Sequence, residues 1–339
     1  MFVRQMKLCA VYKRYDILNQ LGSGAFGTVW KACQRKTKTQ CAMKAIDKKK
    51  FEGLGAAEID SMIFREIQLM SNLSHPNIVD ILDVFETPRF VTIALELCTG
   101  GDLADLLLSL KKRREYMSES IAQIYFRQIL SALNYLHTNR VAHRDLKPEN
   151  VMLKHKIKNI HVDVPVLKLA DFGLARATGS RGLMTTFCGT PYYVAPEVIE
   201  QNSSSSSKGP GYSSSVDMWS AGVMLYEMLT GTRPFEDSDG RTLFQKITRA
   251  LRHDFRVSVK SKSSLSISAM DLLNGLLRRP DGMIRRRSHR MTASECLEHS
   301  WMHSEKRKRG NDDARRKKDL KRHKTVVYEN SPKKSATNS

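Results

Sequence analysis

An acid, a lysine and an asparagine lie within one eight-residue stretch of this chain, His143–Asn150. Asp145 is of a type that can orient a hydroxyl group and accept its proton, and Lys147 can balance the negative charge of a phosphate. Asn150 and the more distant Asp171 carry oxygen atoms, the ligands that Mg²⁺ takes from proteins. Each of these residues alone would be read as a surface charge or a helix cap. Their meaning therefore depends on what the rest of the chain places beside them.

A glycine-rich turn near the start of the chain offers a place for phosphates. The residues Gly22–Gly27 interrupt an alternation of apolar and polar residues that begins at Tyr15 and resumes through Ala32. Glycine suits a turn whose backbone amides approach phosphate oxygens, because no side chain intervenes. The G-x-G-x-x-G spacing alone is weak, since dinucleotide-binding folds share it, but those folds need a helix directly afterwards. Thr28–Trp30 favours a strand, so the sequence predicts a strand–turn–strand hairpin.

Four motifs, taken in their order along the chain, resemble the signature set of the protein kinase family. They are the glycine turn, Lys44 within the apolar run Cys41–Ile46, the octapeptide His143–Asn150, and Asp171-Phe172-Gly173. A lone lysine in an apolar strand would otherwise be read as a side chain that reaches out to solvent. The order and spacing of all four motifs make independent surface charges a poor explanation.

Further segments narrow this resemblance to one class and one group of kinases. Lys147, two residues after Asp145, resembles the serine/threonine class rather than the tyrosine class, and so does Cys188–Pro191. Phe187–Pro191 and Tyr226–Gly231 look most like the calcium/calmodulin-dependent kinase group, which includes checkpoint kinases. The resemblance implies a serine/threonine protein kinase that uses ATP and Mg²⁺.

The resemblance also assigns roles to particular residues. Asp145 and Lys147 would act on the transferring group, and Asn150 and Asp171 would hold the metal ion. The residues implied to bind the nucleotide come from the glycine turn, the strands and helix of the first lobe, the hinge, and the start of the second lobe. They are Gly22, Gly24, Gly27, Val29, Ala42, Lys44, Glu66, Leu95, Glu96, Cys98, Asp102 and Met152.

Two of these assignments carry alternatives. The backbone of Glu96–Cys98 would bind adenine as the hinge, with Leu95 as the gatekeeper, although a buried strand that ends in a loop would look similar. Glu66, on a helix expected over residues 58–72, would form an ion pair with Lys44. Glu52 and Glu58 are the alternative acids for this ion pair.

A regulatory switch follows from the same resemblance. A phosphate on Thr186 would bring nearly two negative charges, and Arg144, beside Asp145, is an always-cationic partner for it. We therefore predict activation by phosphorylation at Thr186, with Thr185 as the second choice. The phosphate would come from an upstream activating kinase or from autophosphorylation in trans. The alternative is a loop that is ordered without modification.

Acidic residues indicate a substrate preference for basic sequences. By resemblance, three acids would face Arg or Lys two or three residues before the phosphoacceptor. They are Asp102, Glu149 and Glu227. Asp102 departs from the pattern, because it is one carbon shorter than the family's common glutamate.

Periodic patterns predict the elements that must position these residues. Core helices are expected over residues 118–138, 216–230, 243–251, 267–277 and 292–299. Strands are expected in the apolar runs 78–84 and 90–97, and an exposed hairpin loop over 154–164. The expected fold class is α+β, a two-lobed protein kinase fold. An N-terminal antiparallel β-sheet lobe with one helix would cover about residues 15–98, and a mainly helical C-terminal lobe about 99–303.

Basic residues dominate the end of the chain, residues 304–339, which we expect to be a disordered tail after a short N-terminal extension over residues 1–14. The formal net charge is +21, and Lys306–Arg309 and Arg315–Lys318 suit a bipartite nuclear localisation signal read by an import receptor. Unspecific nucleic-acid contact and a merely solvated end are the alternatives. The tail offers few apolar anchors beyond Leu320, so we do not expect calmodulin to bind it.

The remaining composition fits a globular intracellular protein in the nucleus and cytoplasm, without a membrane partner. No apolar run is long enough to cross a bilayer, and Met1–Val11 has no signal-peptide core. The six cysteines include no C-x-x-C pair, which predicts reduced thiols and no structural zinc. A serine-rich segment, 203–215, has the composition of a mobile loop, with a phosphorylation cluster as a second interpretation.

Two rival functions remain beside a kinase that binds ATP and protein substrates. One is a catalytically inactive kinase-fold scaffold, against which the intact Lys44, Asp145, Asn150 and Asp171 argue. The other is a nucleic-acid-associated binding protein that acts through the basic tail.

Overall fold

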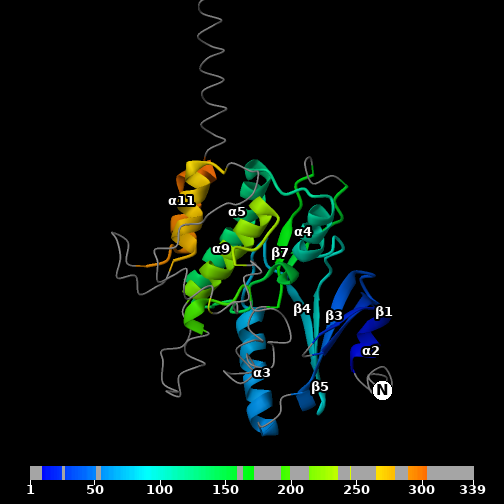
Figure 1. The fold of residues 1–339 in the computed structure, drawn as a ribbon. Coiled ribbons are helices and arrows are strands. Elements are labelled where there is room, and N and C mark those ends of the chain that lie inside the picture. The colour runs from blue at the N-terminus through cyan, green and yellow to red at the C-terminus, as the bar shows by residue number, and fades with distance from the viewer. Residues whose placement is uncertain are drawn as a thin grey trace, which may run out of the picture.

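The structure is a computed structural model of the chain, and it describes most of the residues between 10 and 303. The described residues are 10–24, 27–50, 55–158, 163–171, 192–198, 214–235, 245, 265–278 and 289–303. Figure 1 shows a sheet flanked by one long helix, and beside it a larger group of helices. This arrangement confirms the predicted two-lobed α+β fold. No helix in the described ranges is both long and apolar enough to span a membrane.

Five antiparallel strands form the sheet of the first lobe, in the order β1-β2-β3-β5-β4. They are β1 (Tyr15–Gly24), β2 (Gly27–Gln34), β3 (Gln40–Asp47), β4 (Ile81–Glu86) and β5 (Phe90–Glu96). Strand β3 lies in the middle of the sheet, because β2 and β5 pair with its two edges, and most of its residues are buried. In this register Lys44 lies opposite Val29 on one side and Ile93 on the other. The predicted lysine therefore stands in the middle of the sheet.

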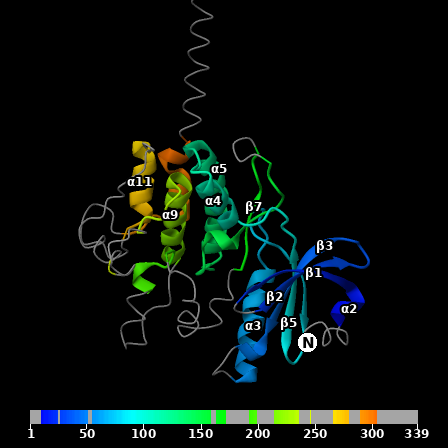
Figure 2. The ribbon, with the colours of Figure 1, turned by 45° about the vertical axis from the view of Figure 1, so that its right-hand side comes forward.

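One helix, α3 (Ala56–Ser71), covers a face of this sheet (Figure 2). Its isoleucines recur every four residues, so they lie on one side of the helix. They pack against apolar side chains of β3 and β5, and the cluster is Ile46, Ile59, Ile63, Ile67, Val91 and Ile93. The predicted helix over residues 58–72 is confirmed to within two residues at each end.

A short helix, α2 (Ala10–Arg14), precedes β1, where the sequence predicted only a basic extension. Val11 is 1% exposed and packs with Tyr15 and Phe85, and Arg14 forms an ion pair with Asp83 at 2.8 Å. Val11 alone was too weak a signal to reveal this helix beside Lys13 and Arg14. The described part of the extension thus closes one end of the sheet.

Two central helices, α5 (Glu119–Thr138) and α9 (Ser215–Thr230), form the core of the second lobe. α9 packs against α5 on one side and against α11 (Ile267–Leu276) on the other. Every residue of α9 from Val216 onward is buried, as expected for a helix with apolar residues all round. The smaller elements of this lobe are α4 (Leu103–Lys112), η2 (Pro148–Asn150), α12 (Ala293–Glu298) and η4 (Ser300–His303).

Side-chain caps explain why the predicted helix starts are accurate. The Ser118 hydroxyl accepts a hydrogen bond from Ile121 N at the start of α5, and the Thr292 hydroxyl accepts one from Glu295 N at the start of α12. These are residue types that favour the end of a helix because they satisfy its free amides. The predicted helix over 243–251 lies outside the described residues apart from residue 245, and the segment 203–213 lies outside them entirely.

One predicted strand begins in the wrong place. The apolar run 78–84 was expected to be continuous, but β4 begins at Ile81. Ile78 instead bridges to Leu169 on β7 (Leu167–Leu169), a strand of the second lobe that pairs with β6 (Val151–Leu153). The segment before β4 is therefore used to join the lobes. The predicted hairpin loop over 154–164 does connect β6 and β7.

Candidate active site

The octapeptide His143–Asn150 is held at its start by Asp217, a completely buried residue of α9. One carboxylate oxygen of Asp217 accepts a hydrogen bond from His143 N and the other accepts one from Arg144 N, each at 2.8 Å. The ring of His137, from α5, lies 2.8 Å from the same carboxylate. Arg144 adopts a φ of 67°, a strained conformation for a side-chain-bearing residue, which these bonds hold in place.

Three predicted residues of the octapeptide meet at one carboxylate. Lys147 Nζ lies 3.0 and 2.8 Å from the two carboxylate oxygens of Asp145. The Asn150 side-chain amide donates to Asp145 Oδ2 at 3.0 Å and to the Asp145 carbonyl at 2.7 Å. Asn150 occupies this position because η2 turns the chain back toward Asp145. The sequence expectation that these residues form one site is therefore matched by their geometry.

Lys44 reaches from the first lobe to Asp171 in the second. Lys44 Nζ lies 2.6 Å from Asp171 Oδ1, and the lysine is 8% exposed. Asp171 has a φ of 60°, and its neighbour Ala170 is fixed on both sides. Ala170 N donates to the Asn150 carbonyl at 2.9 Å, and the Ala170 carbonyl lies 3.1 Å from the His143 ring. The two predicted groups of charged residues thus belong to one continuous site.

The expected ion pair between Lys44 and Glu66 stays a prediction. Glu66 lies on α3 as expected, but its side chain is outside the described part of the structure, as is Glu52. The alternative Glu58 accepts a hydrogen bond from Gly55 N at 3.1 Å, so it serves the start of α3. The helix is positioned by another lysine that sequence reasoning missed, Lys48.

Lys48 ties α3 to the sheet through two acids. Its Nζ lies 2.5 Å from Asp60 on α3 and 2.6 Å from Glu86 on β4. Burial alone would lower the pKa of Lys48, but hydrogen bonds to the two acids outweigh it and raise this pKa. The charged lysine is therefore stabilised where it stands. Three consecutive lysines in the sequence, 48–50, gave no indication of which one is buried.

The three glycines of the turn have two different explanations. A Cβ added at Gly22 or Gly24 would meet nothing within 4 Å, so the space above these residues is open for a ligand. A Cβ added at Gly27 would lie 1.8 Å from the Ala45 carbonyl of β3. Gly27 is therefore required by close strand packing, and the expected role of the three glycines at the phosphates stays a prediction. Residues 25 and 26 lie outside the described residues.

The residues predicted as gatekeeper and hinge lie at the end of β5 and directly after it. Leu95 lies opposite Ala42 of β3, which brings two of the predicted nucleotide contacts together. Glu96 N donates to the Asp80 carbonyl at 2.9 Å, so this amide is already used. Burial raises the pKa of the Cys98 thiol to about 11, which makes it a poor nucleophile at neutral pH.

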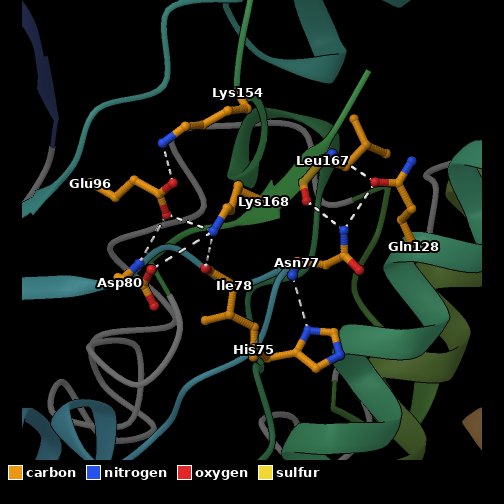
Figure 3. Close-up of polar contacts among 9 residues, drawn as sticks. All are labelled: His75, Asn77, Ile78, Asp80, Glu96, Gln128, Lys154, Leu167 and Lys168. Atoms are coloured by element: carbon orange, nitrogen blue, oxygen red, sulfur yellow. Dashed lines mark hydrogen bonds and ion pairs between the residues drawn. The ribbon is translucent and has the colours of Figure 1, made fainter. Parts of the chain in front are cut away.

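The side chain of Glu96 contacts two lysines of the second lobe, Lys154 and Lys168, as Figure 3 shows. Lys168, on β7, places its Nζ 2.7 Å from Glu96 Oε2 and 3.2 Å from the Ile78 carbonyl, and Lys154 bonds to the other oxygen of Glu96. Burial alone would raise the pKa of Glu96, but hydrogen bonds from Lys154 and Lys168 lower it. This network, which sequence reasoning missed, fixes the hinge to the second lobe.

A neutral network continues the connection beside it (Figure 3). Asn77, in the segment before β4, donates to Gln128 Oε1 at 3.0 Å and to the Leu167 carbonyl at 2.9 Å. Gln128, on α5, also accepts a hydrogen bond from Leu167 N at 2.9 Å. His75 accepts one from Asn77 N at 3.0 Å. The polar residues at 75–77 therefore hold the first lobe onto α5 and β7.

The remaining predicted residues of the nucleotide site border the start of α4. Asp102 forms an isolated bridge with Met152 of β6, so two predicted contacts again lie together. Asp102 Oδ1 also accepts a hydrogen bond from Asp105 N at 2.8 Å and thereby caps α4. Gly101 has a φ of 82°, a conformation that favours glycine.

The residues predicted for substrate preference and regulation divide into described and undescribed ones. Glu149 is exposed in η2, whereas Glu227 is buried in α9 and interacts with Tyr193 and Arg233 of the same chain. Arg144 is placed beside Asp145, but Thr185 and Thr186 lie outside the described residues. The predicted switch between Arg144 and Thr186 stays a prediction.

Comparison with known proteins agrees with the geometry. The sequence model of the family "Protein kinase domain" matches residues 15–302. The probable serine/threonine-protein kinase fhkE of Dictyostelium discoideum is 38% identical over 288 residues, which is 85% of this chain and 38% of that protein. Calcium/calmodulin-dependent protein kinase type IV of Mus musculus is 35% identical over 290 residues, 85% of this chain and 54% of that protein.

A solved structure shows the same likeness. The crystal structure of Rad53 residues 1–466 in complex with AMP-PNP has a TM-score of 0.63 and 33% sequence identity, and it covers 86% of this chain and 66% of that chain. Rad53 of Saccharomyces cerevisiae is described as a serine/threonine-protein kinase. The present chain spans only a third to a half of the length of fhkE, Rad53 and the type IV kinase.

Proposed function

The chain belongs to the protein kinase family, and from this premise we propose that it is an ATP-dependent serine/threonine kinase of protein substrates. The observation that carries the proposal is the meeting of two groups of polar side chains, one of which joins the two lobes. Asp145, Lys147 and Asn150 form one group, and Lys44 and Asp171 form the other. Its similarity to serine/threonine kinases supports a hydroxyl as the acceptor.

The reaction requires positioning and charge neutralisation rather than covalent work by the protein. The substrate hydroxyl oxygen would form a bond to the γ-phosphorus as the bond to the β–γ bridging oxygen breaks, and the hydroxyl proton would pass to Asp145. Lys147 is bound to Asp145 at 2.8 Å, which supports a role in balancing the charge of the transferring group. Lys44 would hold the other phosphates.

Asn150 and Asp171 fit a Mg²⁺ site. Both hydrogen bonds of the Asn150 side chain to Asp145 use its NH₂ group, so its carbonyl oxygen is the atom suited to a metal ion. One carboxylate and one amide oxygen suit Mg²⁺, which takes one or two carboxylates and completes its shell with water and phosphate oxygens. The ion would neutralise charge on the triphosphate.

A phosphorylation assay with ATP and a randomised peptide library tests this function. We expect the chain to label serine- and threonine-containing peptides, and we expect Asp145→Asn to lower the rate by roughly 10²- to 10⁴-fold, because proton transfer is lost. Wild-type chain that binds ATP but labels no peptide would favour the inactive scaffold instead. DNA retention that depends on residues 304–339 and falls with salt would favour the nucleic-acid alternative.

We further propose that phosphorylation of Thr186 activates the enzyme through Arg144, with Thr185 as the second choice of site. An upstream kinase or a second copy of the chain would supply the phosphate. Thr186→Ala and Arg144→Ala should each lower activity of the phosphorylated enzyme. Full activity in both variants would reject the switch.

We also propose that the tail carries an import signal, so deletion of residues 304–339 should shift the protein from the nucleus to the cytoplasm.

A further inference from the structure

The buried acid Glu227 already has a basic partner in its own chain. Arg233 follows α9 closely, and its Nε lies 3.4 Å from Glu227 Oε1. The other oxygen of Glu227 accepts a hydrogen bond from the Tyr193 hydroxyl. The guanidinium carbon of Arg233 lies over the ring of Tyr192, 4.5 Å from its centroid, and 5.8 Å from that of Tyr193.

These groups make a complete site for a guanidinium. A carboxylate supplies the opposite charge, and the face of a tyrosine ring attracts a cation above it. Glu227 and Tyr192 provide both, and Tyr193 fixes the orientation of the carboxylate. The site is occupied by Arg233.

The guanidinium site lies at one end of a strip of acids beside the octapeptide. Glu227 accepts a hydrogen bond from the Tyr193 hydroxyl, and Glu149 lies in η2, which packs against α4, the helix that Asp102 caps. Burial raises the pKa of Tyr193, and the negative charges of Glu227 and Glu149 raise it further. Burial also raises the pKa of Asp102, and neighbouring acids, Glu149 among them, add to that effect. We call this the acidic strip, and it consists of Asp102, Glu149 and Glu227.

We propose that Arg233 takes, from within the chain, the place where the acidic strip would otherwise bind an arginine of the substrate. The inference rests on the proposed kinase function and refines its preference for basic substrates. A substrate arginine at Glu227 would meet the like charge of Arg233, whereas Glu149 is exposed and Asp102 is only half-buried. The strip therefore selects one basic residue of the substrate instead of two.

The geometry makes this a competition between two arginines. A distance of 3.4 Å is longer than the 2.7–2.9 Å of a strong charge-assisted hydrogen bond, and the Arg233 side chain is 30% exposed. Glu227 is buried and its other oxygen is held by Tyr193, so it can pair with one guanidinium, either that of Arg233 or that of a substrate. Removal of Arg233 would leave Glu227 and the tyrosines in place and open the site.

The test compares wild type with Arg233→Ala in a peptide library that has arginine or alanine at each position before the acceptor. The full chain is used. Arg233→Ala is expected to gain a preference for arginine at one additional position, by about fivefold in kcat/KM, the ratio that one partly exposed ion pair provides. Arg113→Ala removes the same charge from an exposed position after α4 and serves as the control, with an unchanged profile expected.

A second variant separates selection from stability. Glu227→Gln keeps an acceptor for Tyr193 but removes the charge, so the gain should disappear in the double variant Arg233→Ala, Glu227→Gln. An unchanged profile in Arg233→Ala, or a gain that survives Glu227→Gln, overturns the proposal. The affinity of fluorescent peptides with one or two arginines is measured in parallel by anisotropy. If no peptide is phosphorylated, the proposed kinase function fails, and the binding difference alone decides the role of Arg233.

Discussion

At the scale of single residues, Glu96 joins the lobes through charge. Its backbone belongs to the strand that leads into the hinge, and its carboxylate belongs to a network with Lys154 and Lys168. A nucleotide bound to the hinge backbone would therefore rest on a segment whose side chain is fixed from the second lobe. Substitutions in this network should affect both stability and nucleotide affinity.

Lys168 is the most buried member of this network, with 6% of its surface exposed. Lys168→Met would leave Glu96 Oε2 and the Ile78 carbonyl without this partner, so we expect it to lower the free energy of unfolding by about 1–3 kcal/mol. Because the hinge loosens, KM for ATP should also rise. Urea unfolding and kinetics at varied ATP measure the two effects. Lys156 is an exposed lysine of the hairpin loop that precedes β7, so Lys156→Met should change stability by less than about 0.5 kcal/mol. Equal losses in both variants would contradict the prediction.

Glu96 also gives stability a defined pH dependence. The two lysines hold the pKa of its carboxyl below the ordinary value of 4.5 despite burial. A group with a lower pKa in the folded state stabilises the fold above its unfolded pKa, and this contribution is lost as the pH falls through the folded pKa. The difference in unfolding free energy between wild type and Glu96→Gln should therefore be constant above about pH 6 and shrink below about pH 4.5. Urea titrations at several pH values measure it; a difference that stays constant into acid would reject the assignment.

At the scale of elements, the β1–β2 hairpin separates two uses of glycine. Gly27→Ala would place a methyl group against the Ala45 carbonyl, so it should push β2 away from β3 and cost about 1–3 kcal/mol of stability. Gly24→Ala meets open space and should leave stability nearly unchanged, while activity falls if the phosphates approach there. Thermal unfolding and peptide phosphorylation of both variants make the comparison. Equal loss of stability would show that the hairpin has a different register.

The same contrast shows what sequence patterns can and cannot predict about elements. Helices α5 and α12 were predicted closely because Ser118 and Thr292 mark their starts by a local hydrogen bond. The start of β4 was missed because Ile78 pairs with Leu169, and such a pairing depends on a distant part of the chain. Local chemistry is readable in sequence, whereas the choice of a distant partner is not.

At the scale of the whole molecule, the fold and the grouping of Asp145, Lys147 and Asn150 were predictable because motif order carries them. The pairings of Lys48, Lys168 and Arg233 were not. Each is one basic residue in a strongly basic chain, and only the packed structure selects the acid that it meets. Which of several basic residues is buried and paired can therefore be identified only in the tertiary structure.

The two-lobed site also predicts a response of the whole molecule to its ligand. ATP with Mg²⁺ should contact groups of both lobes and bind only the folded chain. At 100 times its Kd it should stabilise the fold by about 2.7 kcal/mol. Lys44→Met should remove most of the resulting rise in Tm, because it removes a cation from the phosphate site, whereas Lys36→Met on the exposed β2–β3 turn should keep it. Thermal scans with and without the nucleotide decide between these outcomes.

The burial of α9 on every side should slow the hydrogen exchange of its backbone amides. Each of its residues from Val216 to Thr230 is covered, so its amides have no exposed face from which to open locally. Their exchange with deuterium should therefore wait for unfolding of the whole lobe and follow its free energy, while amides of α3, which has exposed positions, should exchange sooner. Mass spectrometry of exchange at increasing urea measures both helices. The amides of α9, the helix that holds the octapeptide through Asp217, should then exchange more slowly than those of α3. Faster exchange in α9 than in α3 would contradict this.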